Sequence, residues 1–113
     1  MIKFIETKTP IKICDIGASP KDKTKFIEEL FISTNSTLIG FEPNNDEFEK
    51  LEKDNSRKKY YNFAIGDGKE KILNICKAVG MSSFLEPDFD YLNNFYGFDK
   101  WSQIVSKVNV KTK

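Results

Sequence analysis

Two short segments with the same plan constrain the fold of this chain most: each is a predicted strand that ends at an acidic residue. The first runs from Ile11 to Ile16 and carries Asp15 near its end, before a turn at Gly17. Its apolar residues at positions 11, 13, 14 and 16 are typical of a strand covered on both faces. The second segment, Thr37 to Phe41, is followed directly by Glu42. The two acids therefore stand at corresponding places in two strands.

Helical patterns separate these strands from each other and from a third. Ser19 followed by Pro20 predicts a helix start, because serine caps a helix and proline suits its first position. Residues 43–47 predict the start of a second helix with an asparagine cap, at Asn44 or Asn45, and this helix fades by residues 55–56. Lys59 to Ile65 is the third predicted strand. The order strand, helix, strand, helix, strand predicts an α/β fold, namely part of a Rossmann-like fold with three parallel strands and two crossover helices.

The pattern changes after the third strand. A turn at residues 66–68 precedes a strand over Lys69 to Lys77, which predicts an antiparallel excursion. Residues 86–88 start a short aromatic segment, from Phe89 to Tyr96, that predicts one or two helical turns. The wider aromatic cluster from Phe84 to Trp101 is more typical of core cover than of a stacking platform for a substrate. Val105 to Thr112 alternates as a further strand. We expect residues 1–113 to form a single domain that is an incomplete, half fold, because an α/β domain normally continues with more strands and helices.

Composition narrows the function classes. Hydrophobic residues make up 39% and charged residues 31%, which is typical of a soluble globular protein, and the net charge of +1 favours no nucleic-acid partner. No run approaches the roughly 20 apolar residues of a membrane span, and the first residues lack a signal-peptide pattern, so we expect no membrane partner and a cytoplasmic location. The chain has no histidine, and its two cysteines, Cys14 and Cys76, are too far apart for a metal motif. Both thiols are predicted to be buried, and no metal is expected.

The paired acids indicate a nucleoside-like ligand. Ligands of open α/β sheets bind beyond the carboxyl ends of the strands. At the end of the first strand, Gly17 allows a tight turn. At the end of the second, Glu42 occupies the position at which Rossmann-type proteins carry the acid that binds ribose hydroxyls. The first motif is D-x-G-x-S and lacks the G-x-G-x-x-G glycines that hold a pyrophosphate. This favours a cofactor with ribose and adenine but no phosphate bridge, of which S-adenosylmethionine is the prominent case.

Three motifs in this order and spacing resemble a known family. Asp15-Ile-Gly-Ala-Ser, Gly40-Phe-Glu-Pro-Asn and Asn62-Phe-Ala-Ile-Gly-Asp are similar to motifs of the FkbM-type methyltransferases, and the likeness continues through residues 82–83 and 108–112. It covers residues 11–112. These enzymes depend on S-adenosylmethionine and have a Rossmann-like fold. The chain departs from the family at Ser19, because family members commonly have asparagine at this position and a second glycine soon after it. The chain also ends before the Asp-x-Glu-Gly strand end that the family has.

The resemblance implies a set of cofactor contacts. Asp15 and Gly17 would line the methionine and ribose side, Glu42 would hold the ribose diol, and Asn62 and Ala64 would border the adenine. It also implies methyl transfer to a hydroxyl group of a small-molecule or glycan acceptor, a sugar or another small metabolite. No catalytic residue is assignable. The complete set of predicted cofactor-binding residues is Asp15, Gly17, Ala18, Ser19, Glu42, Pro43, Asn62 and Ala64.

Other interpretations stay open. The chain is alternatively a non-catalytic remnant or interaction module that keeps the first half of the fold, or a nucleotide-binding α/β protein such as a dehydrogenase fragment. Asp15 alone is also compatible with an Asx-turn, and Glu42 alone with a solvated acid at a strand end. Self-association through the strand over residues 105–112 is a further prediction, because an uncapped edge presents unpaired backbone groups.

Overall fold

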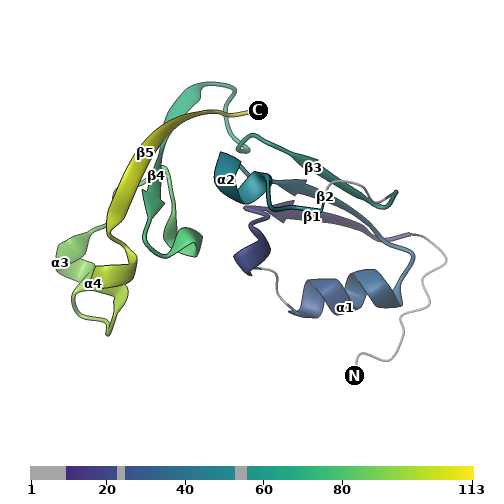
Figure 1. Cartoon of the computed structure of the whole chain (residues 1–113), viewed down its shortest axis with the longest axis horizontal. Coiled ribbons are helices and arrows are strands. Elements are labelled where there is room, and N and C mark those ends of the chain that lie inside the picture. The colour runs from purple at the N-terminus through teal and green to yellow at the C-terminus, as the bar shows by residue number, and fades with distance from the viewer. Residues whose placement is uncertain (1–9, 23–24, 53–55) are drawn as a thin grey trace. The chain divides into compact units, whose positions relative to one another are not determined.

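The computed structural model describes residues 10–22, 25–52 and 56–113 and is a mixed α/β structure (Figure 1). It divides into two compact units, residues 1–62 and residues 63–113. Each unit contains its own sheet, with three parallel strands in the first and an antiparallel pair in the second. The predicted parallel strands and the antiparallel excursion are thus confirmed, whereas the single domain stays a prediction.

The first unit is built on the parallel sheet. Its strands are β1 (Lys12–Ile16), β2 (Thr37–Phe41) and β3 (Lys58–Tyr61), and β2 lies between the other two. The bounds of β2 agree with the prediction, whereas the third strand ends four residues before the predicted Ile65, because the chain bends at residues 62–63. In register, Asp15 pairs with Gly40 and Ile16 with Phe41. The carboxyl ends of β1 and β2 therefore lie side by side.

Helix α1 (Lys25–Ser33) lies on one side of the sheet (Figure 1). The predicted start at Pro20 is instead a short 3₁₀ turn over Pro20–Asp22, followed by residues outside the described part of the chain. At the other end, the Arg57 guanidinium donates to the carbonyl oxygens of Phe31 and Thr34, at 3.3 and 3.0 Å. These bonds satisfy carbonyls that a helix end leaves without a partner in the helix.

Helix α2 (Asn45–Phe48) is a single turn at the carboxyl ends of the strands. Its predicted cap is confirmed, since the Asn44 side-chain oxygen accepts a hydrogen bond from the Asp46 N–H at 3.1 Å. The longer helix predicted to fade by residues 55–56 is wrong. The helix ends at Phe48, and the chain turns through residues 49–51.

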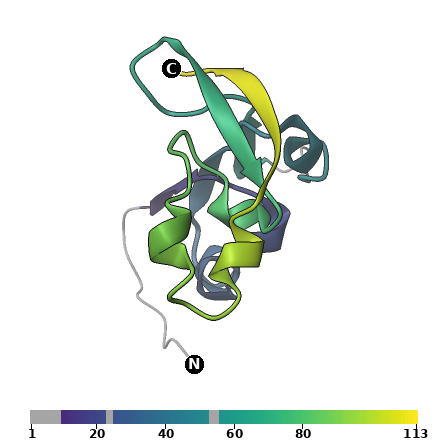
Figure 2. The ribbon, with the colours of Figure 1, turned by 90° about the vertical axis from the view of Figure 1, so that its left-hand side faces the viewer.

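The second unit is a twisted ribbon of β4 (Glu70–Cys76) and β5 (Ile104–Lys111), with α3 (Phe89–Leu92) and α4 (Phe98–Trp101) between them in sequence. The two short helices lie side by side at one end of the ribbon (Figure 2). The antiparallel partner of β4 is β5, which follows about thirty residues later. A long connection that contains α3 and α4, and not a tight hairpin turn, therefore joins the two strands. Self-association through β5 stays a prediction.

The core of the second unit is small. Ala64, Leu73 and Val110 form a buried cluster, and Ile75 and Phe84 pack against it. Phe84 thus confirms part of the predicted core cover. The rings farther along the aromatic segment do not, because α3 and α4 contain no buried residue.

The two cysteines differ in burial. Cys76 is buried as predicted, but the prediction for Cys14 is wrong, because its side chain is exposed. Along β1 the more exposed residues alternate with partly buried ones, so Cys14 shares an open face of the strand with Ile16. The prediction that the first strand is covered on both faces is therefore wrong for the described residues. Within the same residues, no helix has the length and apolar character needed to cross a membrane.

Candidate functional site

The candidate site begins where the loop after β1 meets the end of β2. The N–H groups of Gly17 and Ala18 both donate to the carbonyl oxygen of Phe41, at 2.9 and 3.0 Å. Gly17 has a φ of +80°, a conformation that glycine adopts without steric cost. Ala18 and Ser19 are buried directly behind this turn. The loop is thus held against the residue that precedes Glu42.

Glu42 is oriented by the protein itself. The residue is 5% exposed, and its Oε1 accepts a hydrogen bond from the Asn44 N–H at 2.8 Å. Its own N–H donates to the Tyr61 carbonyl of β3 at 3.0 Å, and Pro43, partly buried, links it to α2. The carboxylate therefore has a defined direction at the carboxyl edge of the sheet.

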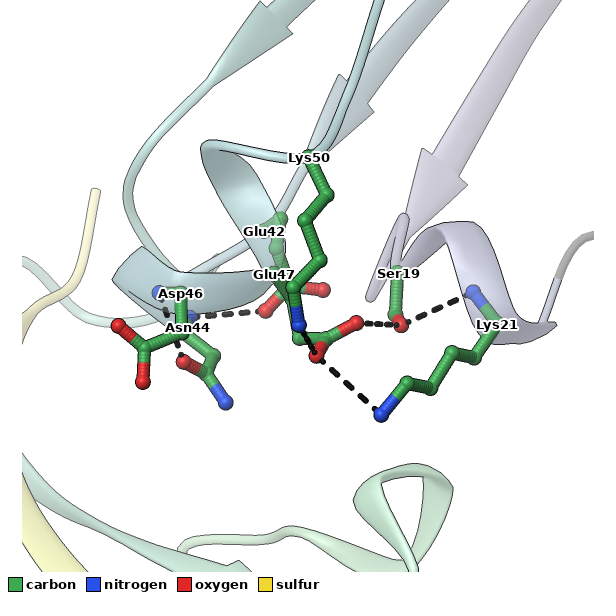
Figure 3. A network of polar contacts seen from close by, with 7 residues as sticks. All are labelled: Ser19, Lys21, Glu42, Asn44, Asp46, Glu47 and Lys50. Carbon is green, nitrogen blue, oxygen red and sulfur yellow. Dashed lines mark hydrogen bonds and ion pairs between the residues drawn. The ribbon is translucent and has the colours of Figure 1, made fainter.

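A second acid, Glu47 of α2, holds the β1 loop (Figure 3). Its Oε2 accepts the Ser19 hydroxyl at 2.9 Å, and its Oε1 lies 2.7 Å from the Lys50 Nζ and 3.6 Å from the Lys21 Nζ. The Ser19 Oγ in turn accepts the Lys21 N–H at 3.3 Å. Glu47 is 2% exposed, so one buried carboxylate joins α2 to both the loop and the 3₁₀ turn.

The electrostatics of Glu47 favour its charged form. The hydrogen bond from Lys50 is the main cause that lowers its pKa below the ordinary value. Burial acts in the opposite direction, and the Ser19 hydroxyl and the charge of Lys21 lower the pKa further. The carboxylate is ionised at neutral pH and can keep all three contacts.

A pocket of about 450 Å³ lies between α1 and the sheet. It reaches the candidate site at Asp15 and Gly17, which are among its lining residues. Small-molecule sites usually enclose about 300–1,000 Å³ and are mostly apolar with a few polar groups, and this pocket has that character. Its lining consists of Asp15, Ile16, Gly17, Ile27, Glu28, Phe31, Ile32, Leu38, Lys58 and Tyr60.

Tyr60 supplies a hydrogen-bonding group to this pocket. Burial raises the pKa of its phenol, and the negative charges of Asp15, Glu52 and Glu28 raise it further. The phenol is therefore protonated at neutral pH and can donate. Its ring also packs on the backbone of β2, since a Cβ placed on Gly40 would lie 2.5 Å from a Tyr60 ring carbon.

The structure brings most of the predicted cofactor residues of the first unit together, from Asp15 to Ser19 and at Glu42 and Pro43. Asn62 is exposed, and its Nδ2 donates to the Asn45 Oδ1 at 2.8 Å, at the start of α2. Ala64 belongs to the second unit, where it is a buried core residue.

Sequence reasoning missed two residues of this site, Glu47 and Tyr60. Glu47 reads in sequence as an ordinary acid of the first helical turn, favoured there by the helix dipole. Its pairing with Lys50 three residues later is the one local hint of a partner. Nothing local connects it with Ser19, which is 28 positions away. Among the described residues, no group of three or more candidate side chains could hold a metal ion.

These residues form a polar strand-end site next to a pocket of the size that small-molecule sites usually have. Comparisons with protein-family models, with curated proteins and with solved structures find no match for this chain.

Proposed function

We propose that the chain is an S-adenosylmethionine-dependent methyltransferase of the FkbM type, or its cofactor-binding half, with a Rossmann-like arrangement of the first unit. The acceptor in this proposal is a hydroxyl group of a sugar or small metabolite, as the resemblance implies. The strand order β1-β2-β3 with β2 in the middle supports it, because this is the order of the first half of such a fold.

The observation that carries the proposal is the pair of hydrogen bonds from Gly17 and Ala18 to Phe41. They hold the glycine turn of the first strand beside Glu42, at the edge where ligands of parallel sheets bind. A ribose ring has two neighbouring hydroxyl groups that a single carboxylate can accept. Hydrogen bonds to a charged group each contribute about 1.5–3 kcal/mol, so Glu42 would supply a large part of the affinity.

The pocket beside the turn supports a small-molecule cofactor. Asp15 lines it, and its carboxylate would attract the ammonium group of the methionine part of the cofactor. The protonated Tyr60 phenol offers a donor in the same pocket. Apolar side chains of α1 and β2 make up much of the remaining wall and would cover the less polar part of the ligand.

Methyl transfer makes few chemical demands on these residues. The reaction is an in-line displacement at the methyl carbon bound to sulfur, and the enzyme mainly brings the acceptor oxygen to roughly 3–3.5 Å from that carbon. The described residues of the site bind and orient the cofactor in this proposal. No residue is assigned the task of removing the acceptor proton.

Calorimetric titration with S-adenosylmethionine and S-adenosylhomocysteine tests the proposal. We expect binding that Glu42→Gln weakens at least tenfold, because glutamine can still accept the Asn44 N–H but carries no charge. Asp46→Asn is the matched control, since it removes an exposed acid of the same region. Its affinity should equal that of the unchanged protein.

A folded protein that binds neither compound would refute the cofactor proposal. The non-catalytic module would then be favoured, and one observation already supports that alternative. The Ser19 hydroxyl both donates to Glu47 and accepts from Lys21 within the protein, so its hydrogen-bonding capacity is largely used. Binding of a nicotinamide dinucleotide in place of S-adenosylmethionine would instead favour the dehydrogenase-like alternative.

A further inference from the structure

The aromatic segment of the second unit leaves its rings exposed. Tyr91, Phe95, Phe98 and Trp101 form a chain of tilted ring contacts with centroids 5.3–5.9 Å apart. Each of these rings is between 38% and 63% exposed, and the neighbouring Tyr96 is 98% exposed. Single exposed rings are common, but a contiguous group of them marks a binding surface.

Three of these rings, Phe95, Tyr96 and Trp101, line a pocket of about 500 Å³ within the second unit. Its residues come from one stretch of sequence, between the end of α3 and the end of α4. The volume is suited to a ligand of one or two sugar rings. The lining consists of Asn93, Phe95, Tyr96, Gly97, Asp99, Lys100 and Trp101.

The indole of Trp101 is held in place by the turn before α4. Gly97 has a φ of +82°, and a Cβ at this position would lie 2.9 Å from the indole ring. The absence of a side chain therefore lets the ring lie against the backbone. The Phe98 ring contacts the same indole at a centroid distance of 5.3 Å. These contacts support the partly exposed indole where it lines the pocket.

The polar groups of the pocket have balanced charges. Asp99 and Lys100 carry opposite charges, and neither side chain forms an ion pair with another residue of the described chain. Asn93 adds an amide that can both donate and accept. Because the two charges offset each other, the pocket gives little net electrostatic attraction to either a cation or an anion. The pocket is therefore suited to a neutral ligand with several hydroxyl groups.

We propose that this pocket binds a neutral pyranose ring. One face of such a ring is made of C–H groups, which would stack on the faces of Trp101 and Tyr96. The hydroxyl groups at its edge would bond to Asp99, Lys100 and Asn93. The proposal stands without the cofactor site, because every lining residue belongs to the second unit.

Trp101 is the only tryptophan of the chain, so its fluorescence reports on this pocket directly. We would titrate the full chain with the methyl glycosides of glucose, galactose and mannose, and with disaccharides of the same sugars. We expect a saturable change in emission, with a dissociation constant in the millimolar range for at least one of them. Tyr96→Ala and Asp99→Ala should weaken that binding at least tenfold.

Tyr91→Ala is the matched control, because Tyr91 is an exposed ring of the same segment that does not line the pocket. Its affinity for the sugar should be unchanged. Far-ultraviolet circular dichroism verifies that each variant is folded, and unfolding is not expected at Tyr96, which is almost fully exposed. Sugar C–H signals should also receive saturation transfer from the aromatic protons in magnetic resonance.

Three results would overturn the proposal. The first is the absence of a saturable response to every sugar by the folded chain. The second is a response to choline or inorganic phosphate that the sugars do not produce, which would identify a charged ligand. The third is sugar binding that both Tyr96→Ala and Asp99→Ala leave intact, which would place the binding elsewhere. None of these results depends on whether S-adenosylmethionine binds.

Discussion

Ser19 and Glu47 are joined by a buried hydrogen bond of 2.9 Å across 28 positions of the sequence. Ser19 follows the turn after β1, and Glu47 belongs to α2, which follows β2. The bond therefore ties together the two connections that leave the carboxyl edge of the sheet. Because Lys50 and Lys21 share the same carboxylate, the position of the loop depends on the charge of Glu47.

The first prediction concerns the pH dependence of stability. The pKa of Glu47 is lowered in the folded protein, chiefly by the hydrogen bond from Lys50, so the unfolded chain binds this proton more readily. The stabilisation from Glu47 is complete above its unfolded pKa and is lost as the pH falls through the folded pKa. Glu47→Gln should remove this part of the acid sensitivity, as measured by urea unfolding between about pH 6 and about pH 3.

Asp46→Asn provides the comparison for this experiment. Asp46 is an exposed acid that precedes Glu47 in the same turn, so its variant should keep the acid sensitivity of the unchanged protein. At neutral pH, Glu47→Ala should lower the free energy of unfolding by about 1–3 kcal/mol, because the Ser19 hydroxyl loses a charged acceptor. Parallel pH profiles for Glu47→Gln and the unchanged protein would contradict this account.

Two glycines of the site should resist substitution for different reasons. Gly40→Ala places a Cβ 2.5 Å from the Tyr60 ring and 2.9 Å from the Ala18 Cβ, and we expect a loss of about 1–3 kcal/mol from overpacking. Gly17→Ala meets no atom within 4 Å, but its φ of +80° should cost about 1–2 kcal/mol. Denaturant unfolding of both variants measures these losses.

A double-mutant cycle separates the two causes. In a Tyr60→Ala background the clash with the ring is removed and only the one with the Ala18 Cβ remains, so Gly40→Ala should become less costly. The cost of Gly17→Ala should stay the same. An equal cost of Gly40→Ala in both backgrounds would show that Tyr60 does not set the limit at this position.

A buried hydroxyl group of the second unit should also contribute to stability. Thr112 is fully buried, and its Oγ1 donates to the Lys69 carbonyl at 2.8 Å. Thr112→Val keeps the shape but leaves that carbonyl without this donor, and we expect a loss of about 1–2 kcal/mol in the free energy of unfolding. Ser106→Ala removes an exposed hydroxyl from β5 and should have little effect. A similar loss in both variants would argue against a specific role of Thr112.

The two thiols should react at very different rates. Cys14 is exposed, whereas Cys76 is buried, and burial raises the pKa of the Cys76 thiol, so fewer thiolates form. Iodoacetamide should modify Cys14 rapidly in the native protein and Cys76 only after denaturation. Mass spectrometry of the two peptides over time measures both rates. Rapid native modification of Cys76 would show that the core of the second unit opens easily.

Local patterns determined much of the secondary structure. The strand over Thr37–Phe41 and the cap at Asn44 depend on residues close in sequence, and both were predictable for that reason. The adjacency of the Gly17 turn and Glu42 was also predictable, because parallel strands joined by crossovers bring their carboxyl ends to one edge.

Only the tertiary structure decided the partners and the exposed surfaces. Ser19 reads as a helix cap, and its hydroxyl oxygen does accept the Lys21 N–H. The same hydroxyl also donates to Glu47, and no local signal specifies a contact between residues so far apart. The alternation along β1 shows which residues share a face but not whether that face is covered, and so the exposure of Cys14 was not foreseen. Apolar patterns report the tendency of a side chain to be buried, whereas burial itself requires a partner that only the folded chain supplies.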